Sequence, residues 1–95
     1  MKAKKPTMAQ RARWDDVAAI GCIVDYAINE RCCSPAEIHH AMTGAGGRKD
    51  HDKVLPLCYT HHRGRCGIHT IGRAAWKEIY GTESELLEKV EELLS

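Results

Sequence analysis

The chain has 95 residues, the size of one small domain whose apolar core is only marginally stable by itself. Its five cysteines are an odd number, and no apolar segment is long enough for a signal peptide or a membrane span. We therefore expect a reducing, cytoplasmic setting, in which cysteines mixed with histidines indicate metal binding more than disulfides. The net charge of +1 combines residues 1–77, with 13 Lys/Arg against 7 Asp/Glu, and residues 78–95, with 1 against 6. The basic part favours a polyanion such as nucleic acid, beside the plainer interpretation of a solvated mixed surface.

The N-terminal part predicts a basic arm followed by a helix. Residues 1–6 (MKAKKP) are expected to form a flexible basic arm, and residues 7–95 a single domain. Thr7 and Gln10 have the spacing of a capping box, and Gly21 should end the helix that starts there. The apolar residues between them recur at roughly helical spacing: Met8, Ala12, Val17 and Ile20.

The middle of the chain predicts a β-hairpin. The segment CIVDYAINERCC, residues 22–33, is compatible with a short helix or a turn. After it, AEIHHAM and KVLPLC are short apolar runs separated by a glycine-rich loop, TGAGGRKDHD. Pro56 removes one ladder donor, so the second strand should lie at an edge or end near that residue.

The C-terminal part predicts helices. A short helix and a turn around Gly64 and Gly67 should follow CYTHHRG. In GRAAWKEIYG we expect Ala75, Ile79 and Trp76 to face the core. The last helix should begin at a second capping box, of Thr82 and Glu85. Its apolar stripe is continuous: Leu86, Leu87, Val90, Leu93 and Leu94. Strands followed by helices predict an α+β fold.

The unit Cys58-Tyr-Thr-His61 has the spacing of half a structural zinc site. Such a site needs two more ligands. The candidates are other cysteines: Cys22 for one, Cys32 or Cys33 for the other, and Cys66 as a weaker substitute. The competing interpretation is that these thiols are buried and behave as small hydrophobic groups.

Five of the six histidines lie within residues 33–64, in two adjacent pairs and one single residue. Neighbours on a strand face opposite ways, and neighbours on a helix lie about 100° apart. One member of a pair can therefore bind metal while the other acts as a base. Phosphodiester hydrolysis requires both, an ion on the scissile phosphate and a neutral imidazole for water. A single histidine would more often be structural.

The motifs EIHH, PLCYTHHRG and GIH, with the glycine-rich loop between the first two, resemble the HNH endonucleases. That resemblance implies a ββα-metal (His-Me finger) core, in which a hairpin and a helix hold one catalytic ion. The longer ordered set GCIV, SPAEIHH, PLCYTHHRG, GIHTIGRAAW and YGTESELLEKV is similar to the phage recombination-enhancement (Ref, RecA-dependent) nucleases. This similarity runs from about Gly21 to Val90 and implies a phage or prophage protein acting in a bacterial host cell.

The resemblance also implies roles for individual residues. His39 and His62 would bind the catalytic ion (Mg²⁺, Mn²⁺ or Zn²⁺), and His69 would be a further ligand or a phosphate contact. His40 would be the general base. His51 lies near the place of the family's central polar residue, which orients the base, and Asp52 is its rival for that role.

Two features depart from the family patterns. The central Asn of the HNH motif is absent, so His51 or Asp52 would have to substitute for it. The family often has GCIVC, whereas this chain has Asp25 in place of the second cysteine. From the sequence, a structural zinc would have to recruit Cys32 or Cys33, or be lost.

Basic residues are interleaved with these motifs and are candidates for nucleic-acid binding: Arg48, Lys49, Arg63 and Arg65. Arg63 and Arg65 directly follow His62 and Gly64, and a guanidinium matches phosphate geometry bidentately, so they are the best phosphate clamps among the four. Ordinary solvation is the competing interpretation.

The leading hypothesis is a metal-dependent DNA endonuclease with a ββα-metal core, an N-terminal helix, C-terminal amphipathic helices and a structural zinc. A recombinase filament is a candidate partner, and no membrane partner is expected. The alternative is a non-catalytic zinc module that binds DNA or a protein. The two differ in whether an ion site keeps an open coordination position.

Overall fold

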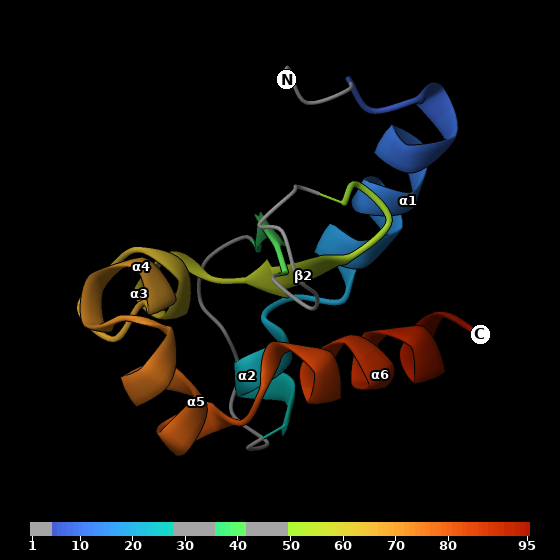
Figure 1. The fold of residues 1–95 in the computed structure, drawn as a ribbon. Helices are drawn as coiled ribbons and strands as arrows, with labels where there is room; N and C mark the ends of the chain where they lie inside the picture. The colour runs from blue at the N-terminus through green and yellow to red at the C-terminus, as the bar shows by residue number, and fades with distance from the viewer. Residues whose placement is uncertain (1–4, 28–35, 42–49) are drawn as a thin grey trace.

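The computed structural model describes residues 5–27, 36–41 and 50–95. Within these ranges the fold is α+β, with helices around a two-stranded sheet (Figure 1). The elements are α1 (Met8–Ala19), α2 (Ile23–Ala27), β1 (Glu37–His40), β2 (Val54–Leu57), α3 (Tyr59–His62), α4 (Ile68–Ile71), α5 (Arg73–Tyr80) and α6 (Glu83–Leu94). Most of the expected basic arm lies outside the described residues, as do Cys32, Cys33, Arg48 and Lys49.

The predicted hairpin is confirmed. β1 pairs antiparallel with β2, from Glu37 opposite Leu57 to His40 opposite Val54. All of β2 is buried, which fits its unbroken apolar sequence VLPL. Pro56 is tolerated because each strand of a two-stranded sheet is an edge.

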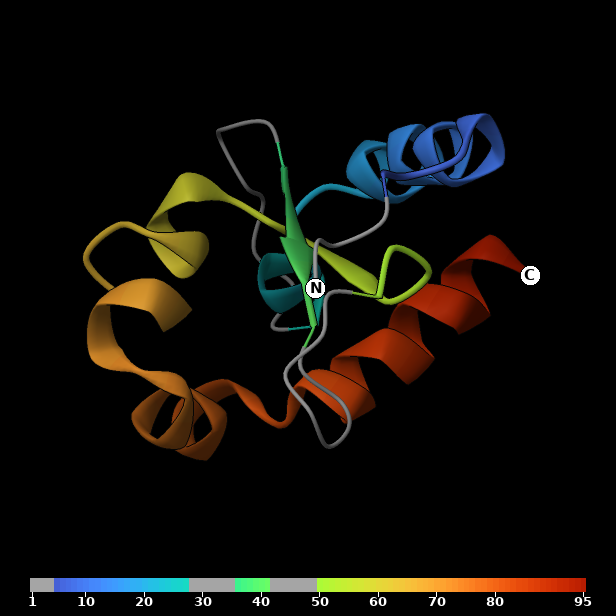
Figure 2. The same ribbon diagram turned by 45° about the horizontal axis from the view of Figure 1, so that its top comes forward.

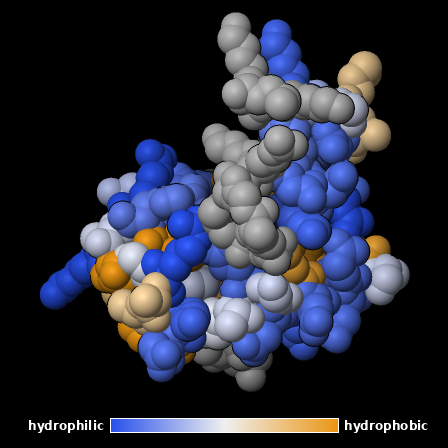
Figure 3. Space-filling model, viewed as in Figure 1, coloured by the Kyte–Doolittle hydropathy of each residue, from blue (hydrophilic) through white to orange (hydrophobic). Residues whose placement is uncertain are grey.

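The hairpin lies between two groups of helices. Figures 1 and 2 both place α1 and α6 on one side of the strands and α3, α4 and α5 on the other. Helices α1, α2 and α6 each contact β2. The visible surface over α1 and α6 is predominantly hydrophilic (Figure 3). In the described part of the chain, no helix combines the length and the apolar character needed to cross a membrane.

The start of α1 is as predicted, but its apolar face is not. The Thr7 hydroxyl accepts from the Gln10 amide at 3.0 Å, and the Gln10 side chain accepts from the Thr7 amide at 2.8 Å. Val17 is buried, whereas Met8 is 89% exposed. The N-terminal half of the helix projects beyond the sheet (Figure 1), so only its C-terminal half has a surface to pack against. Gly21, at φ 85°, follows the helix as expected.

The segment that the sequence left open begins as a helix. In α2, Ile23 and Val24 are buried, and the helix contacts both β2 and α6. Cys22 is buried immediately before it.

Gly67 allows α3 and α4 to approach closely. A Cβ built on Gly67 would lie 2.6 Å from the carbonyl oxygen of His62, a distance that no real side chain tolerates. This approach brings the face of α4 that carries His69 next to the end of α3.

The core prediction for α5 is correct for one residue of three. Trp76 is fully buried, and its indole nitrogen donates to the His61 carbonyl at 3.1 Å. Ala75 is exposed, and Ile79 is 63% exposed. Trp76 is the buried residue of this short helix.

Helix α6 agrees with its prediction. Leu86 and Val90 are buried, and the rest of the expected stripe packs partly buried against the core: Leu87, Leu93 and Leu94. The Thr82 hydroxyl accepts from the Glu85 amide at 3.1 Å, so the N-cap half of the predicted capping box is present. The Glu85 carboxylate accepts from the Thr82 hydroxyl at 3.0 Å.

Candidate active site and metal centres

Two groups of described residues bring metal-ligand atoms within 4.8 Å of one another. One consists of His39, His62 and His69, and the other of Cys22, Asp25, Cys58 and His61. Adjacent histidines of the sequence are therefore divided. His61 and His62 belong to different groups, and His39 belongs to a group while its neighbour His40 contacts other side chains.

The three-histidine group joins β1 to α3 and α4. His39 is buried at 2% exposure, whereas His69 is exposed at the surface. The Nε2 atoms of His62 and His69 lie 3.2 Å apart, and the His39 ring centroid is 5.1 Å and 5.2 Å from those of His62 and His69. Burial is the main cause that lowers the pKa of His69, and the neighbouring His39 and His62 lower it further. The neutral imidazole that this favours is the form that binds metal.

A carboxylate contacts His62 on the side away from His69. Glu37 Oε1 lies 2.8 Å from His62 Nδ1. Arg63 donates to both oxygens of the same carboxylate, Nε to Oε1 at 3.1 Å and Nη2 to Oε2 at 2.8 Å. Hydrogen bonds from Arg63 and then from His62 lower the pKa of Glu37 to about 2. Glu37 is therefore ionised at any pH at which the protein would work.

A second carboxylate contacts His39. Glu83, at the start of α6, is buried, and its Oε1 lies 3.3 Å from His39 Nε2. Arg73 Nε donates to the same oxygen at 3.0 Å. The sequence motifs did not indicate either carboxylate, because Glu37 and Glu83 reach the histidines only through the folding of distant segments.

His40 forms a pair with His51. The two rings meet at 3.0 Å between His40 Nε2 and His51 Nδ1. Since a neutral imidazole has one donor and one acceptor nitrogen, one of these atoms carries the shared proton. Trp14 of α1 donates its indole N–H to the His51 carbonyl at 2.8 Å, and its ring lies edge-on to both imidazoles. Asp52, the alternative to His51 as the residue that orients the base, instead accepts from the Gln10 side-chain amide at 3.1 Å.

The second group of ligands converges on one atom of His61. Its Nδ1 lies 3.2 Å from Cys58 Sγ, 3.6 Å from Cys22 Sγ and 3.5 Å from an Asp25 carboxylate oxygen. Burial is the main factor that raises the pKa of Cys22. Asp25 was not among the ligands expected from the sequence, although its place three residues after Cys22 was a usable signal.

The candidate phosphate clamps differ in their surroundings. Arg63 is 61% exposed at its side chain, and both described bonds go to Glu37. Arg65 is exposed. A hollow of about 370 Å³ next to Glu83 is lined in part by two more cations, Arg73 and Lys77.

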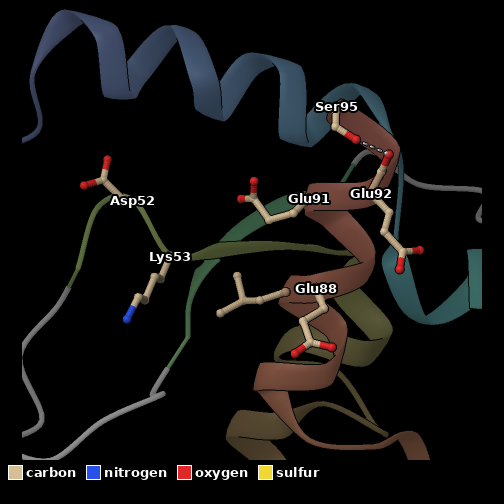
Figure 4. Close-up of a pocket in the computed structure, with 7 residues that line it drawn as sticks. Asp52, Lys53, Glu88, Glu91, Glu92 and Ser95 are labelled. Carbon is tan, nitrogen blue, oxygen red and sulfur yellow. Dashed lines mark hydrogen bonds between the residues drawn. The ribbon is translucent and has the colours of Figure 1, made fainter.

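An acidic groove lies elsewhere on the molecule. It has a volume of about 710 Å³ between α6 and the loop before β2. Figure 4 shows Glu91 on α6 pointing toward the loop that carries Asp52 and Lys53, while Glu88 and Glu92 extend from the same helix in other directions. This concentration of carboxylates repels phosphate, so a nucleic acid should approach from another side.

The family comparison covers nearly the whole chain and includes every residue of both groups. The model of the family described as "recombination enhancement, RecA-dependent nuclease" matches residues 6–95. The chain belongs to this family. The family match confirms the resemblance to the recombination-enhancement nucleases and makes nuclease the class of the protein. No curated protein matches the chain.

Proposed function

We propose that this RecA-dependent nuclease family member is a metal-dependent DNA endonuclease of the HNH, or ββα-metal, class. The observation that carries the proposal is the division of His39 and His40, adjacent residues of β1, between a three-histidine group and a histidine pair. This is the division between metal ligand and base that phosphodiester hydrolysis requires.

His39, His62 and His69 would hold one catalytic divalent ion, Mg²⁺, Mn²⁺ or Zn²⁺. The ligand nitrogens of three imidazoles lie within 4.8 Å of one another. Imidazole donors suit Zn²⁺ best, and Mg²⁺ or Mn²⁺ would take most of its remaining ligands from water and phosphate oxygens. Three protein ligands are also typical of catalytic sites, which keep a position for water or substrate. An ion held there supplies charge neutralisation at the scissile phosphate and its leaving oxygen.

His40 would act as the general base and take a proton from the attacking water. His51, at 3.0 Å, would hold the His40 ring and share a proton with it. Trp14 would keep His51 in place through the bond to its carbonyl. These contacts restrict the rotation of both imidazoles, which is how a protein fixes the direction of a proton transfer.

Cys22, Asp25, Cys58 and His61 would hold a structural zinc. Four donor atoms within 4.8 Å suit the closed tetrahedral geometry of such sites. The Asp25 carboxylate makes the fourth donor of this group, so we propose Asp25 as the fourth ligand.

DNA would be bound by basic residues around the histidines, among them Arg65, Arg73 and Lys77. Arg48 and Lys49, which the sequence places between the two strands, would add to this binding. Their attraction to phosphate does not depend on base sequence. A recombinase filament on DNA, in the cytoplasm of a bacterial host, is the proposed setting, in keeping with the family description.

Nicking of supercoiled plasmid by His40→Ala protein tests the mechanism. Chelator-treated protein is returned to Mg²⁺, Mn²⁺ or Zn²⁺ and assayed on bare plasmid and on DNA coated with a RecA filament. We expect the substitution to lower the ion-dependent rate by at least about 100-fold, the contribution of a general base. DNA binding and helical content should stay at parental levels.

Two further variants complete the test. His69→Ala should lose bound catalytic ion as well as activity, whereas His40→Ala should keep the ion. Lys89→Ala, on the exposed face of α6, should cut at the parental rate. Parental cutting by His40→Ala would reject the base assignment. Zinc content of about one per chain with no cutting on either DNA would favour a non-catalytic zinc module.

A further inference from the structure

We propose that Glu37 and Arg63 are positioning residues that prepare His62 to bind the catalytic ion through Nε2. The inference rests on the proposed ion site. It assigns a new role to Glu37 and changes that of Arg63, which the sequence suggested as a phosphate clamp.

The two ring nitrogens of His62 have different surroundings. Nδ1 lies 2.8 Å from Glu37 Oε1, and Nε2 lies 3.2 Å from Nε2 of His69. An ionised carboxylate can only accept a hydrogen bond, so in the neutral ring the proton belongs on Nδ1. The lone pair is then on Nε2, the nitrogen that points to the other ligands. Metal-binding histidines are commonly oriented by a carboxylate in this manner.

Arg63 holds the carboxylate itself. Its guanidinium donates to both Glu37 oxygens, at 3.1 Å and 2.8 Å, in the two-bond geometry that matches the carboxylate plane. The guanidinium also lies 5.4 Å from the centroid of the Tyr59 ring. Both oxygens of Glu37 are thereby restrained, including Oε1, the one that contacts His62.

The three residues connect separate parts of the fold. Glu37 is the first residue of β1, whereas His62 ends α3 and Arg63 follows it. The bonds therefore tie the strand that carries His39 to the helix that carries His62. Loss of the carboxylate should free the His62 ring to rotate and allow its proton to move to Nε2. Loss of such a contact typically weakens metal binding by about 10- to 100-fold.

The test uses full-length protein with its cysteine centre loaded with zinc and its histidines cleared by a weak chelator. Nitrogen-15 NMR at a pH where the histidines are neutral reports which nitrogen of His62 carries the proton. Titration with Mn²⁺ then gives the affinity of the histidine group. The variants are Glu37→Gln, Glu37→Ala and Arg63→Ala. Glu91→Gln is the matched control, because it removes an Arg–Glu pair, with Arg13 at 2.7 Å, away from the histidines.

In the parental protein and in Glu91→Gln we expect His62 to be protonated at Nδ1. Glu37→Ala should shift it toward the Nε2–H form and bind Mn²⁺ about 10- to 100-fold more weakly. Glu37→Gln loses the charge but keeps an oxygen that can accept from Nδ1–H, so it should lie between, as should Arg63→Ala. Helical content measured by circular dichroism shows whether each variant folds, and Glu37→Gln, which preserves side-chain shape, serves if Glu37→Ala does not.

An unchanged His62 tautomer in folded Glu37→Ala protein would overturn the inference, as would a parental Mn²⁺ affinity in either Glu37 variant. A parental protein that binds no Mn²⁺ at its histidines would instead count against the proposed catalytic ion. The tautomer measurement needs no bound Mn²⁺ and would still decide the role of Glu37.

Discussion

At the scale of single residues, the buried surroundings of Asp25 indicate that its carboxylate binds a metal ion. The residue is only 7% exposed and lies beside two thiols and an imidazole. Burying a carboxylate costs several kcal/mol unless a cation or hydrogen bonds compensate. A zinc ion among these four side chains would provide that compensation, which is why we assign the fourth ligand position to Asp25.

Asp25→Asn should weaken zinc binding, and Asp25→Cys should strengthen it, because an amide is a poorer ligand than a carboxylate and a thiolate is a better one. Competition with a chromophoric chelator measures both changes. Replacing zinc by Co²⁺ gives a spectrum whose sulfur-to-metal absorption should increase in Asp25→Cys, as a third thiolate joins Cys22 and Cys58. The controls are Cys32→Ser and Cys33→Ser, which should change neither property. If Cys32→Ser or Cys33→Ser lost the parental Co²⁺ spectrum, the replaced cysteine and not Asp25 would be the fourth ligand.

At the scale of elements, the beginning of α6 links helix capping to the candidate active site. The Thr82 hydroxyl accepts from the Glu85 amide. Glu83, which directly follows Thr82 and is the first residue of the helix, contacts His39. Cap and site therefore share one helical turn. A weak start to α6 would release the carboxylate that contacts His39.

Thr82→Ala should lower the free energy of unfolding by about 1 kcal/mol, because the Glu85 amide loses its acceptor. Urea denaturation followed by circular dichroism measures the change. Thr82→Ser, which keeps the hydroxyl, should remain close to the parental protein. Ser95→Ala removes a hydroxyl bond of similar length, 3.0 Å to the Glu92 carbonyl, at the C-terminal end of the same helix. An equal decrease in the free energy of unfolding in Thr82→Ala and Ser95→Ala would show that the Thr82 cap stabilises the protein no more than the Ser95 hydrogen bond does.

At the scale of the whole molecule, the cysteine centre connects elements that the small core holds only weakly. Cys22 precedes α2, Asp25 lies within it, Cys58 follows β2, and His61 lies in α3. A chain of this length has little apolar surface to bury, so a metal cross-link should contribute a large share of its stability.

Removal of zinc with a strong chelator should lower the Tm of the whole protein. At a free zinc concentration 100 times the Kd, binding contributes about 2.7 kcal/mol to the free energy of unfolding. Differential scanning calorimetry with and without chelator measures the effect. Cys58→Ser protein, which lacks a ligand, should be less stable at the outset and insensitive to the chelator. An unchanged parental Tm after verified zinc removal would contradict the structural role.

The sequence by itself determined what depends on neighbours along the chain. The capping box at Thr7, the N-cap at Thr82, the strands and the stripe of α6 follow from hydrogen bonds and periodicities that span a few residues. The division of His39 from His40 has the same local origin, since strand neighbours face opposite ways. The resemblance to a nuclease family likewise rested on ordered motifs and agrees with the family match.

Only the tertiary structure decided which distant side chains meet. Met8 and Ile79 fit helical stripes and yet are exposed, because burial requires a partner surface that periodicity does not supply. Glu37 reaches His62 across 25 positions, and Glu83 reaches His39 across 44. Such contacts depend on the path of the whole chain, including the close approach that Gly67 permits. The residue types that chemistry requires were therefore visible in the sequence, whereas their partners were set by packing.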